Sequence, residues 1–229
     1  MSSAHDVAAA LSQVRSRIEA ACARAGRDPA SVQLLAASKF QSTDAIRAAY
    51  AAGQRQFGEN YVQELVHKAQ ALADLPALRW HLIGRLQTNK VKDVVRLGCA
   101  VQALDSLKLC QALSQRAAAS GQRVPVYVQV NISEESQKAG VAPAALPQLI
   151  AAARAAPGLD VRGLMAIPRP SEDETEQRAA FRKLRELAET LDLPELSMGM
   201  SDDLELAIEE GATMVRVGTA LFGERPDNP

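Results

Sequence analysis

The feature of this sequence that most restricts its fold is a repeated alternation of short apolar runs with segments of helical character. In the first unit, the apolar run at residues 32–38 suits a buried strand, and Ser42 or Thr43 can cap the helix that follows. Further apolar runs recur at 56–57, 79–83, 100–103, 125–131, 159–165, 195–197 and 213–217. About eight strands that alternate with helices predict an α/β fold, a closed parallel (β/α)8 TIM barrel. An open, doubly wound sheet is the alternative that this pattern leaves open.

Helical segments fill the intervals between the apolar runs. After the first unit they are expected at 61–72, 88–95, 106–119, 144–155, 172–191, 201–209 and 218–222. Residues 1–25 form an additional amphipathic helix, because Val7, Leu11, Val14, Ile18 and Cys22 recur at helical spacing. This helix is expected to pack on the barrel. No linker or low-complexity tract divides the chain, so residues 1–229 are predicted to form a single domain.

Charge and cysteine content exclude several classes of function. The chain has 26 basic and 27 acidic side chains and a net charge of −1, so it offers no electrostatic footprint for DNA or RNA. No segment has the length and apolar character of a membrane span. The three cysteines are widely spaced and lack a CxxC pair, which is typical of core residues in a reducing compartment. We therefore expect a cytoplasmic protein with no nucleic-acid or membrane partner.

Lys39 directly follows the first apolar run, at the strand end where barrels build their functional sites. An ammonium group there is costly to bury unless it is paired or neutralised. A neutral lysine amine is the group that condenses with an aldehyde. The alternative is a lysine whose side chain extends to solvent.

Two segments, 197–203 and 215–220, follow the seventh and eighth predicted strands, where many barrels bind phosphate. Gly199 and Gly218 allow the backbone to approach an anion, and Ser201 and Thr219 add hydroxyl donors. The adjacent acidic residues 202–203 are expected to point outward from a first helical turn. The alternative is an ordinary serine cap followed by a turn glycine.

Three further polar residues lie near predicted strand ends. Arg216 needs an acceptor if it is buried, which a carboxylate, a backbone carbonyl or a ligand ring nitrogen can supply. A purely structural ion pair is the alternative role. His81 and Asn60 are more often satisfied polar groups of a core or loop than functional residues.

Taken together, residues 34–39, 57–64, 80–90 and 163–168 and the two phosphate-loop segments resemble the pyridoxal phosphate homeostasis proteins. The resemblance runs along nearly the whole chain in the same order. It implies the fold of the alanine racemase N-terminal domain, which is fold type III of the pyridoxal phosphate proteins. It also implies bound pyridoxal 5′-phosphate without established turnover.

The resemblance also assigns roles to single residues. It implies that Lys39 forms the internal aldimine, a Schiff base with the cofactor, and that Arg216 faces the pyridine nitrogen. The phosphate group would be held by Ser201, Gly218 and Thr219, and the ring would be lined by Asn60, His81 and Met165. Asn131 and Lys138 match a family segment near the mouth of the site.

An arginine beside the pyridine nitrogen disfavours its protonation, which makes the cofactor a poor electron sink. We therefore expect a protein of pyridoxal phosphate homeostasis that buffers the cofactor and delivers it to apo-enzymes, and not an enzyme. A monomer is also expected, because the sequence lacks the additional β domain that forms the dimer interface of the resembled racemases. The first alternative is an amino-acid racemase with a second acid or base at His81 or Tyr61. The second alternative is a phosphosugar-binding barrel without pyridoxal.

Overall fold

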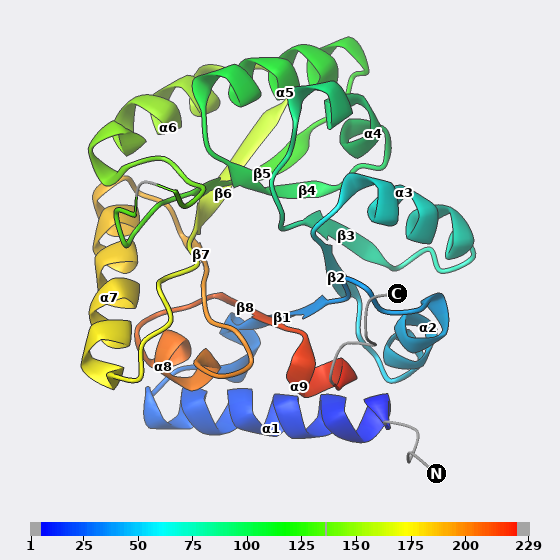
Figure 1. Cartoon of the computed structure of the whole chain (residues 1–229), viewed down its shortest axis with the longest axis vertical. Coiled ribbons are helices and arrows are strands. Elements are labelled where there is room, and N and C mark those ends of the chain that lie inside the picture. Colours follow the sequence, from blue (N-terminus) through cyan, green and yellow to red (C-terminus); the bar gives the residue numbers. More distant parts are fainter. Residues whose placement is uncertain (1–5, 136, 224–229) are drawn as a thin grey trace.

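Eight parallel strands form a closed barrel in the computed structural model, which describes residues 6–135 and 137–223 (Figure 1). The strands follow one another around the ring in chain order, and β8 pairs with β1. Their bounds are β1 (Gln33–Ala37), β2 (Gln56–Glu59), β3 (Arg79–Leu82), β4 (Ala100–Leu104), β5 (Val124–Gln129), β6 (Leu159–Met165), β7 (Glu195–Ser197) and β8 (Met214–Val217). The predicted closed (β/α)8 barrel is confirmed, and the open sheet is excluded.

The helices lie around the outside of this barrel (Figure 1). Their bounds are α1 (Val7–Arg24), α2 (Thr43–Ala51), α3 (Val62–Ala71), α4 (Val91–Arg96), α5 (Leu107–Ala119), α6 (Leu146–Ala155), α7 (Glu174–Thr190), α8 (Leu204–Glu209) and α9 (Thr219–Phe222). Short 3-10 turns occupy Pro29–Ser31, Thr88–Lys90 and Pro143–Ala145. Two helices therefore begin about three residues later than the sequence predicts, α4 after a 3-10 turn and α8 after the turn at 201–203.

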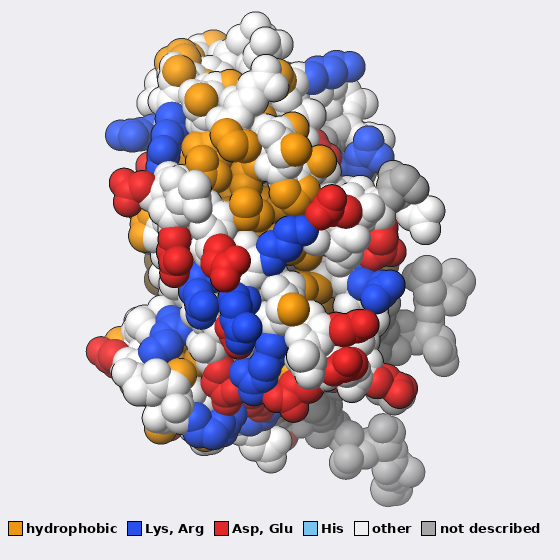
Figure 2. Space-filling model, turned by 90° about the vertical axis from the view of Figure 1, so that its left-hand side faces the viewer, with side chains coloured by type: hydrophobic (Ala, Val, Ile, Leu, Met, Phe, Trp, Pro, Cys, Tyr) orange, Lys and Arg blue, Asp and Glu red, His pale blue; other side chains and the backbone are white. Residues whose placement is uncertain are grey.

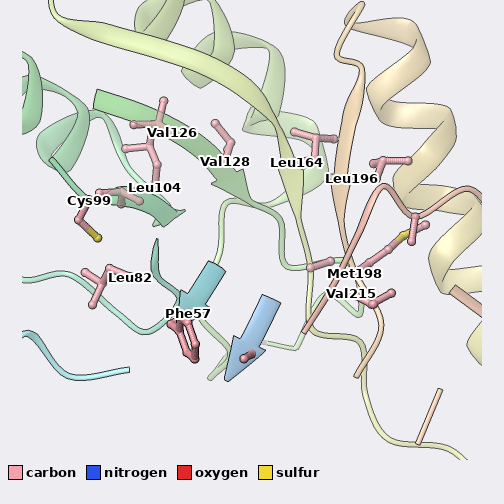
Figure 3. Packing of buried hydrophobic residues seen from close by; sticks show 14 of the residues in the cluster. Phe57, Leu82, Cys99, Leu104, Val126, Val128, Leu164, Leu196, Met198 and Val215 are labelled. Carbon is pink, nitrogen blue, oxygen red and sulfur yellow. The ribbon is translucent and has the colours of Figure 1, made fainter. Parts of the chain in front are cut away.

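Alternation of side chains along the strands separates two apolar layers. On β8, Val215 and Val217 join the large cluster that lies between the strands and the helices, part of which Figure 3 shows. Met214 of the same strand belongs to a separate cluster with Leu35, Tyr127 and Met165. Because successive residues of a strand point to opposite faces, this second cluster fills the interior of the barrel. The barrel is therefore packed below its carboxyl end and is not a pore.

Helix α1 lies beside α8 and α9, where the last strand meets the first (Figure 1). It begins after Asp6, whose carboxylate accepts hydrogen bonds from the backbone N–H groups of Ala8 and Ala9. Its buried face contains the apolar stripe that defines it in the sequence. Arg17 on this helix forms a bidentate ion pair with Glu205 of α8, at 2.6 and 2.9 Å.

Figure 2 shows hydrophobic side chains in the upper part of one face and interspersed charges of both signs below them. Ion pairs join α7 to the end of α8, where Arg178 pairs with Glu209 at 2.7 Å and Arg182 with Glu210 at 3.0 Å. Within residues 6–135 and 137–223, no helix is long and apolar enough to cross a bilayer.

Candidate functional site

A cavity of about 290 Å³ lies at the carboxyl end of the barrel strands. Its wall comes from segments that follow β1, β2, β3, β6, β7 and β8, together with two strand residues, Ala37 of β1 and Arg216 of β8. The lining residues are Ala37, Lys39, Gln41, Asn60, Ile83, Ile167, Met200, Ser201, Asp202, Arg216, Gly218, Thr219 and Gly223. This is the end at which barrel proteins place their functional groups.

Six of the eight residues predicted for the site line this one cavity, although their positions in the chain span residues 39 to 219. They are Lys39, Asn60, Ser201, Arg216, Gly218 and Thr219. The other two, His81 and Met165, are not among the lining residues and are buried in the barrel interior. Met165 belongs to the apolar interior cluster, and His81 takes part in a polar chain described below.

Lys39 reaches the cavity because β1 ends two residues earlier, at Ala37. Its side chain is half-buried. Ser38, between them, is fully buried, and its N–H donates to the carbonyl of Gly58 on the neighbouring strand. Gly218 follows the adjacent strand β8 and lies beside Ala37, where a Cβ would come within 3.2 Å of the Ala37 carbonyl oxygen. A larger residue at 218 would therefore narrow the cavity beside the lysine.

Arg216 is buried in the cavity wall, and both terminal nitrogens of its guanidinium group donate hydrogen bonds. Nη1 donates to the carbonyl oxygen of Ser197 at 2.6 Å and to the Ser197 hydroxyl at 2.9 Å, and Nη2 donates to the carbonyl oxygen of Ala166 at 2.9 Å. Burial lowers the pKa of Arg216 to about 10, so the group is still a cation at neutral pH. These acceptors are carbonyls and a hydroxyl, so the alternative of a structural ion pair does not describe this arginine.

A chain of hydrogen bonds runs from Arg216 across the barrel interior. The Ser197 hydroxyl accepts from Arg216 and donates to Oε1 of Gln102 at 2.7 Å, and Nε2 of Gln102 lies 3.0 Å from Nδ1 of His81. Because arginine can only donate, the Ser197 hydroxyl must donate onward to the Gln102 carbonyl oxygen. The Gln102 amide nitrogen then donates to His81, so Nδ1 of His81 is the acceptor. Burial lowers the pKa of His81 to about 4. His81 is therefore neutral at pH 7, with its proton on Nε2.

The loops after β7 and β8 contact each other at Ser201, whose hydroxyl accepts from the N–H of Ala220 at 3.4 Å. The Ser201 carbonyl accepts from Arg17 at 2.8 Å, so α1 supports this loop.

Asp202 and Asp203 do not point outward from a first helical turn, as the sequence predicts. Asp203 turns back to accept from the N–H of Met200 at 2.6 Å, and Asp202 lines the cavity mouth. The reason is that residues 201–203 form a turn and not the first turn of α8.

Asn131 and Lys138 lie outside the set of lining residues. Nδ2 of Asn131 donates to the carbonyl of Glu135 at 2.7 Å, and Lys138 forms an ion pair with the Glu135 carboxylate at 2.8 Å. Among the described residues, no group of three or more His, Cys, Asp or Glu side chains could hold a metal ion.

The sequence reasoning did not anticipate several residues of the site. Gln41, Ile83, Ile167 and Met200 line the cavity, and Gln102 supports the polar chain beneath it. Gln102 carried a usable signal, because an amide in the middle of an otherwise apolar buried strand needs partners. Ile83, Ile167 and Met200 lie just after β3, β6 and β7, within segments that the sequence singles out, but no residue type there indicates which side chains face the cavity.

The residues present suit pyridoxal phosphate, which carries an aldehyde and a phosphate on a pyridine ring. Lys39 can condense with an aldehyde, while Ser201 and Thr219 can donate to an anion. Gly218 keeps the wall open beside Ala37, and the buried cation of Arg216 supplies a positive group on the cavity wall. The cavity volume lies near the lower end of the range for small-molecule sites.

Comparison with known proteins gives consistent results. The family model for the alanine racemase N-terminal domain matches residues 10–226. The pyridoxal phosphate homeostasis protein of Pseudomonas aeruginosa is 51% identical over 221 residues, which cover 96% of each chain. The structure of PipY from Synechococcus elongatus with pyridoxal phosphate bound superposes with a TM-score of 0.82 at 40% identity and covers 95% of this chain and all of that one.

The alanine racemase of Corynebacterium glutamicum has a TM-score of 0.69 at 18% identity and is similar in fold alone. The match covers 93% of this chain but 61% of the racemase. From the extent of the family match and the identity to the curated relative, the chain belongs to the alanine racemase N-terminal domain family and, within it, to the pyridoxal phosphate homeostasis proteins.

Proposed function

We propose that this protein binds pyridoxal 5′-phosphate as a Schiff base on Lys39 and serves cofactor homeostasis by buffering it and delivering it to apo-enzymes. The observation that carries the proposal is that Lys39, Arg216, Ser201 and Thr219 line one cavity. In its neutral form the Lys39 amine would add to the aldehyde carbon, with one water molecule lost as the carbon–nitrogen double bond forms. The hydroxyls of Ser201 and Thr219, in the loops after β7 and β8, hold the phosphate.

The proposal includes the absence of turnover. Racemisation needs two acid or base groups on opposite faces of the substrate carbon. The two candidates for the second group do not line the cavity: His81 is buried below it, and Tyr61 packs on Phe40 with ring centroids 5.7 Å apart. The cationic Arg216 also disfavours protonation of a pyridine nitrogen beside it, which weakens carbanion chemistry. The wall therefore suits retention of the cofactor better than catalysis.

The proposed setting is the cytoplasm, where the protein acts as a monomer. The three cysteines are buried free thiols, which is consistent with a reducing compartment.

A spectrum before and after borohydride treatment tests the central claim. Wild-type protein mixed with pyridoxal phosphate should show visible absorption, and reduction should fix the cofactor on the peptide that contains Lys39. Lys39→Ala should abolish both signals and leave the far-UV circular dichroism unchanged, because a half-buried side chain at a loop start contributes little packing.

Lys138→Ala is the matched control, because it removes another lysine, one that pairs with Glu135 and does not line the cavity. It should retain the adduct. Reduction that fixes the cofactor on Lys138 instead of Lys39 would contradict the assignment. Racemisation of L-alanine by the wild type, well above that of free cofactor, would contradict the proposed lack of turnover.

A further inference from the structure

A buried ionic cluster lies beside the segment that carries Lys39, outside the cavity itself. Lys68 of α3 is 4% exposed, and its Nζ lies 2.9 Å from Oε1 of Glu59 and 2.6 Å from Oε1 of Glu64. Glu59, at the end of β2, is fully buried and also accepts from the Ser38 hydroxyl at 2.6 Å. None of the three charged residues lines the cavity.

The cluster binds both peptide groups that flank Lys39. On one side, Nζ of Lys68 donates to the carbonyl oxygen of Ser38 at 2.6 Å. On the other side, the N–H of Phe40 donates to Oε1 of Glu64 at 2.6 Å. Peptide groups are planar, so the orientation of the two that meet at a residue determines its backbone angles and the direction of its Cα–Cβ bond. The cluster therefore defines the direction in which the Lys39 side chain leaves the backbone.

The backbone beside Lys39 also needs such support. Phe40 has a φ of +63°, a left-handed conformation that is costly for a residue with a bulky side chain. Strained conformations persist only where the surroundings hold them. Two contacts do so here, the bond from the Phe40 N–H to Glu64 and the packing of its ring on Tyr61.

Stability alone is a weak reason for such a cluster. Burying charged groups costs solvation energy that their attraction often fails to recover, and an apolar set of similar volume is frequently as stable. Burial raises the pKa of Glu59, which reflects this cost, and Oε2 of Glu59 has no hydrogen-bond partner among the described residues. What an apolar set cannot do is donate to the Ser38 carbonyl and accept from the Phe40 N–H.

We propose that the Glu59–Lys68–Glu64 cluster positions Lys39 for covalent capture of the cofactor, with Lys68 and Glu64 as positioning residues that never touch the ligand. The inference rests on the proposed function, because it assumes that Lys39 is the amine that reacts. It predicts that loss of the cluster slows adduct formation more than it weakens binding of the pyridine ring and phosphate.

The test compares two measurements on each variant. The first is the rate of adduct formation with pyridoxal phosphate, followed by absorbance and checked by borohydride trapping. The second is the affinity for pyridoxine 5′-phosphate, which has an alcohol in place of the aldehyde and therefore reports the rest of the pocket alone. Lys68→Met should form the adduct about tenfold more slowly and bind pyridoxine phosphate within about twofold of the wild type. Lys92→Met, the same change on the exposed face of α4, should alter neither value.

A second pair of variants keeps the test decisive if Lys68→Met fails to fold. Glu64 is partly exposed, with 21% of its side chain accessible, so its replacement is tolerable. Glu64→Ala removes the acceptor for the Phe40 N–H and should slow adduct formation, whereas Glu64→Gln keeps a carbonyl oxygen there and should restore the rate.

Adduct formation at the wild-type rate in Glu64→Ala would overturn the inference. A parallel fall in both measurements would also overturn it, because that is what a merely structural cluster predicts. Failure of the proposed function is recognised separately, in the wild type alone, as the lack of any reducible adduct on Lys39.

Discussion

His81 illustrates how one buried residue is fixed by its neighbours. The donor-only Arg216 sets the direction of the chain through Ser197 and Gln102, so His81 receives a hydrogen bond on Nδ1. Protonation at that nitrogen would place two donors against each other in a desolvated layer. The neutral imidazole is therefore part of the folded structure and not a group that titrates near neutral pH.

This arrangement predicts a pH-dependent contribution to stability. The pKa of His81 is about 4 in the folded protein against an ordinary value of 6.5. Because the folded-state pKa is lowered, neutral His81 contributes fully to the free energy of unfolding above pH 6.5. This contribution is lost as the pH falls toward 4, because the unfolded chain takes up a proton that the folded protein does not. The loss amounts to about 2 kcal/mol at pH 5. His81→Asn keeps an acceptor near Nδ1 and should lose less stability than the wild type between pH 7 and pH 5.

Urea unfolding at the two pH values measures this difference. His67→Asn is the control, because His67 is exposed on α3 and its replacement should leave the pH dependence as in the wild type. Equal pH dependence in His81→Asn and the wild type would show that His81 is not held neutral.

At the level of elements, two connecting segments, one after β7 and one after α1, contain glycines with a left-handed backbone in different surroundings. Gly199 has a φ of +90°, and a Cβ there would lie 2.5 Å from the Cβ of Ala207 on α8. Gly26, after α1, has a φ of +64° but no atom within 4 Å of the same position. The two glycines therefore share a left-handed backbone and differ in the space around them.

This pair separates backbone strain from steric overlap. Gly26→Ala should reduce the free energy of unfolding by about 1 to 2 kcal/mol, the cost of the left-handed conformation. Gly199→Ala should lose about 2 kcal/mol more, because α8 must move or the loop must repack. Urea unfolding of both variants measures the difference, and equal losses would show that the loop accommodates the added methyl group.

More of the helices and strands than of the functional site could be predicted from the sequence. The strands follow from apolar runs, and Lys39, Ser201, Arg216, Gly218 and Thr219 follow from their places at strand ends. The start of α8 was missed because the hydrogen bond from the Met200 N–H to Asp203 stabilises a turn, which local propensity does not reveal. The role of Lys68 depends on groups from β2 and the β1 loop that only the barrel register brings together.

At the level of the whole molecule, ligand binding should be coupled to unfolding, because the cavity wall combines loops from both ends of the chain. A ligand that binds only the folded state stabilises it by about 2.7 kcal/mol at 100 times its dissociation constant. For a chain of this size that corresponds to a rise in Tm of about 5 to 10 °C.

Thermal unfolding with pyridoxal phosphate measures this coupling. Pyridoxal, which lacks the phosphate, should give a smaller shift at the same concentration, because Ser201 and Thr219 then have no anion to hold. An equal shift in Tm with both compounds would show that the loops after β7 and β8 do not bind the phosphate group.

The packed interior below the cavity has a kinetic consequence. The barrel is closed below the cavity by the side chains of Leu35, Tyr127, Met165 and Met214. A ligand that enters from the carboxyl end must therefore leave by the same route. A second ligand molecule has no other route by which to displace the first. Exchange of a bound ligand is then limited by how fast the bound molecule dissociates, whatever the concentration of free ligand.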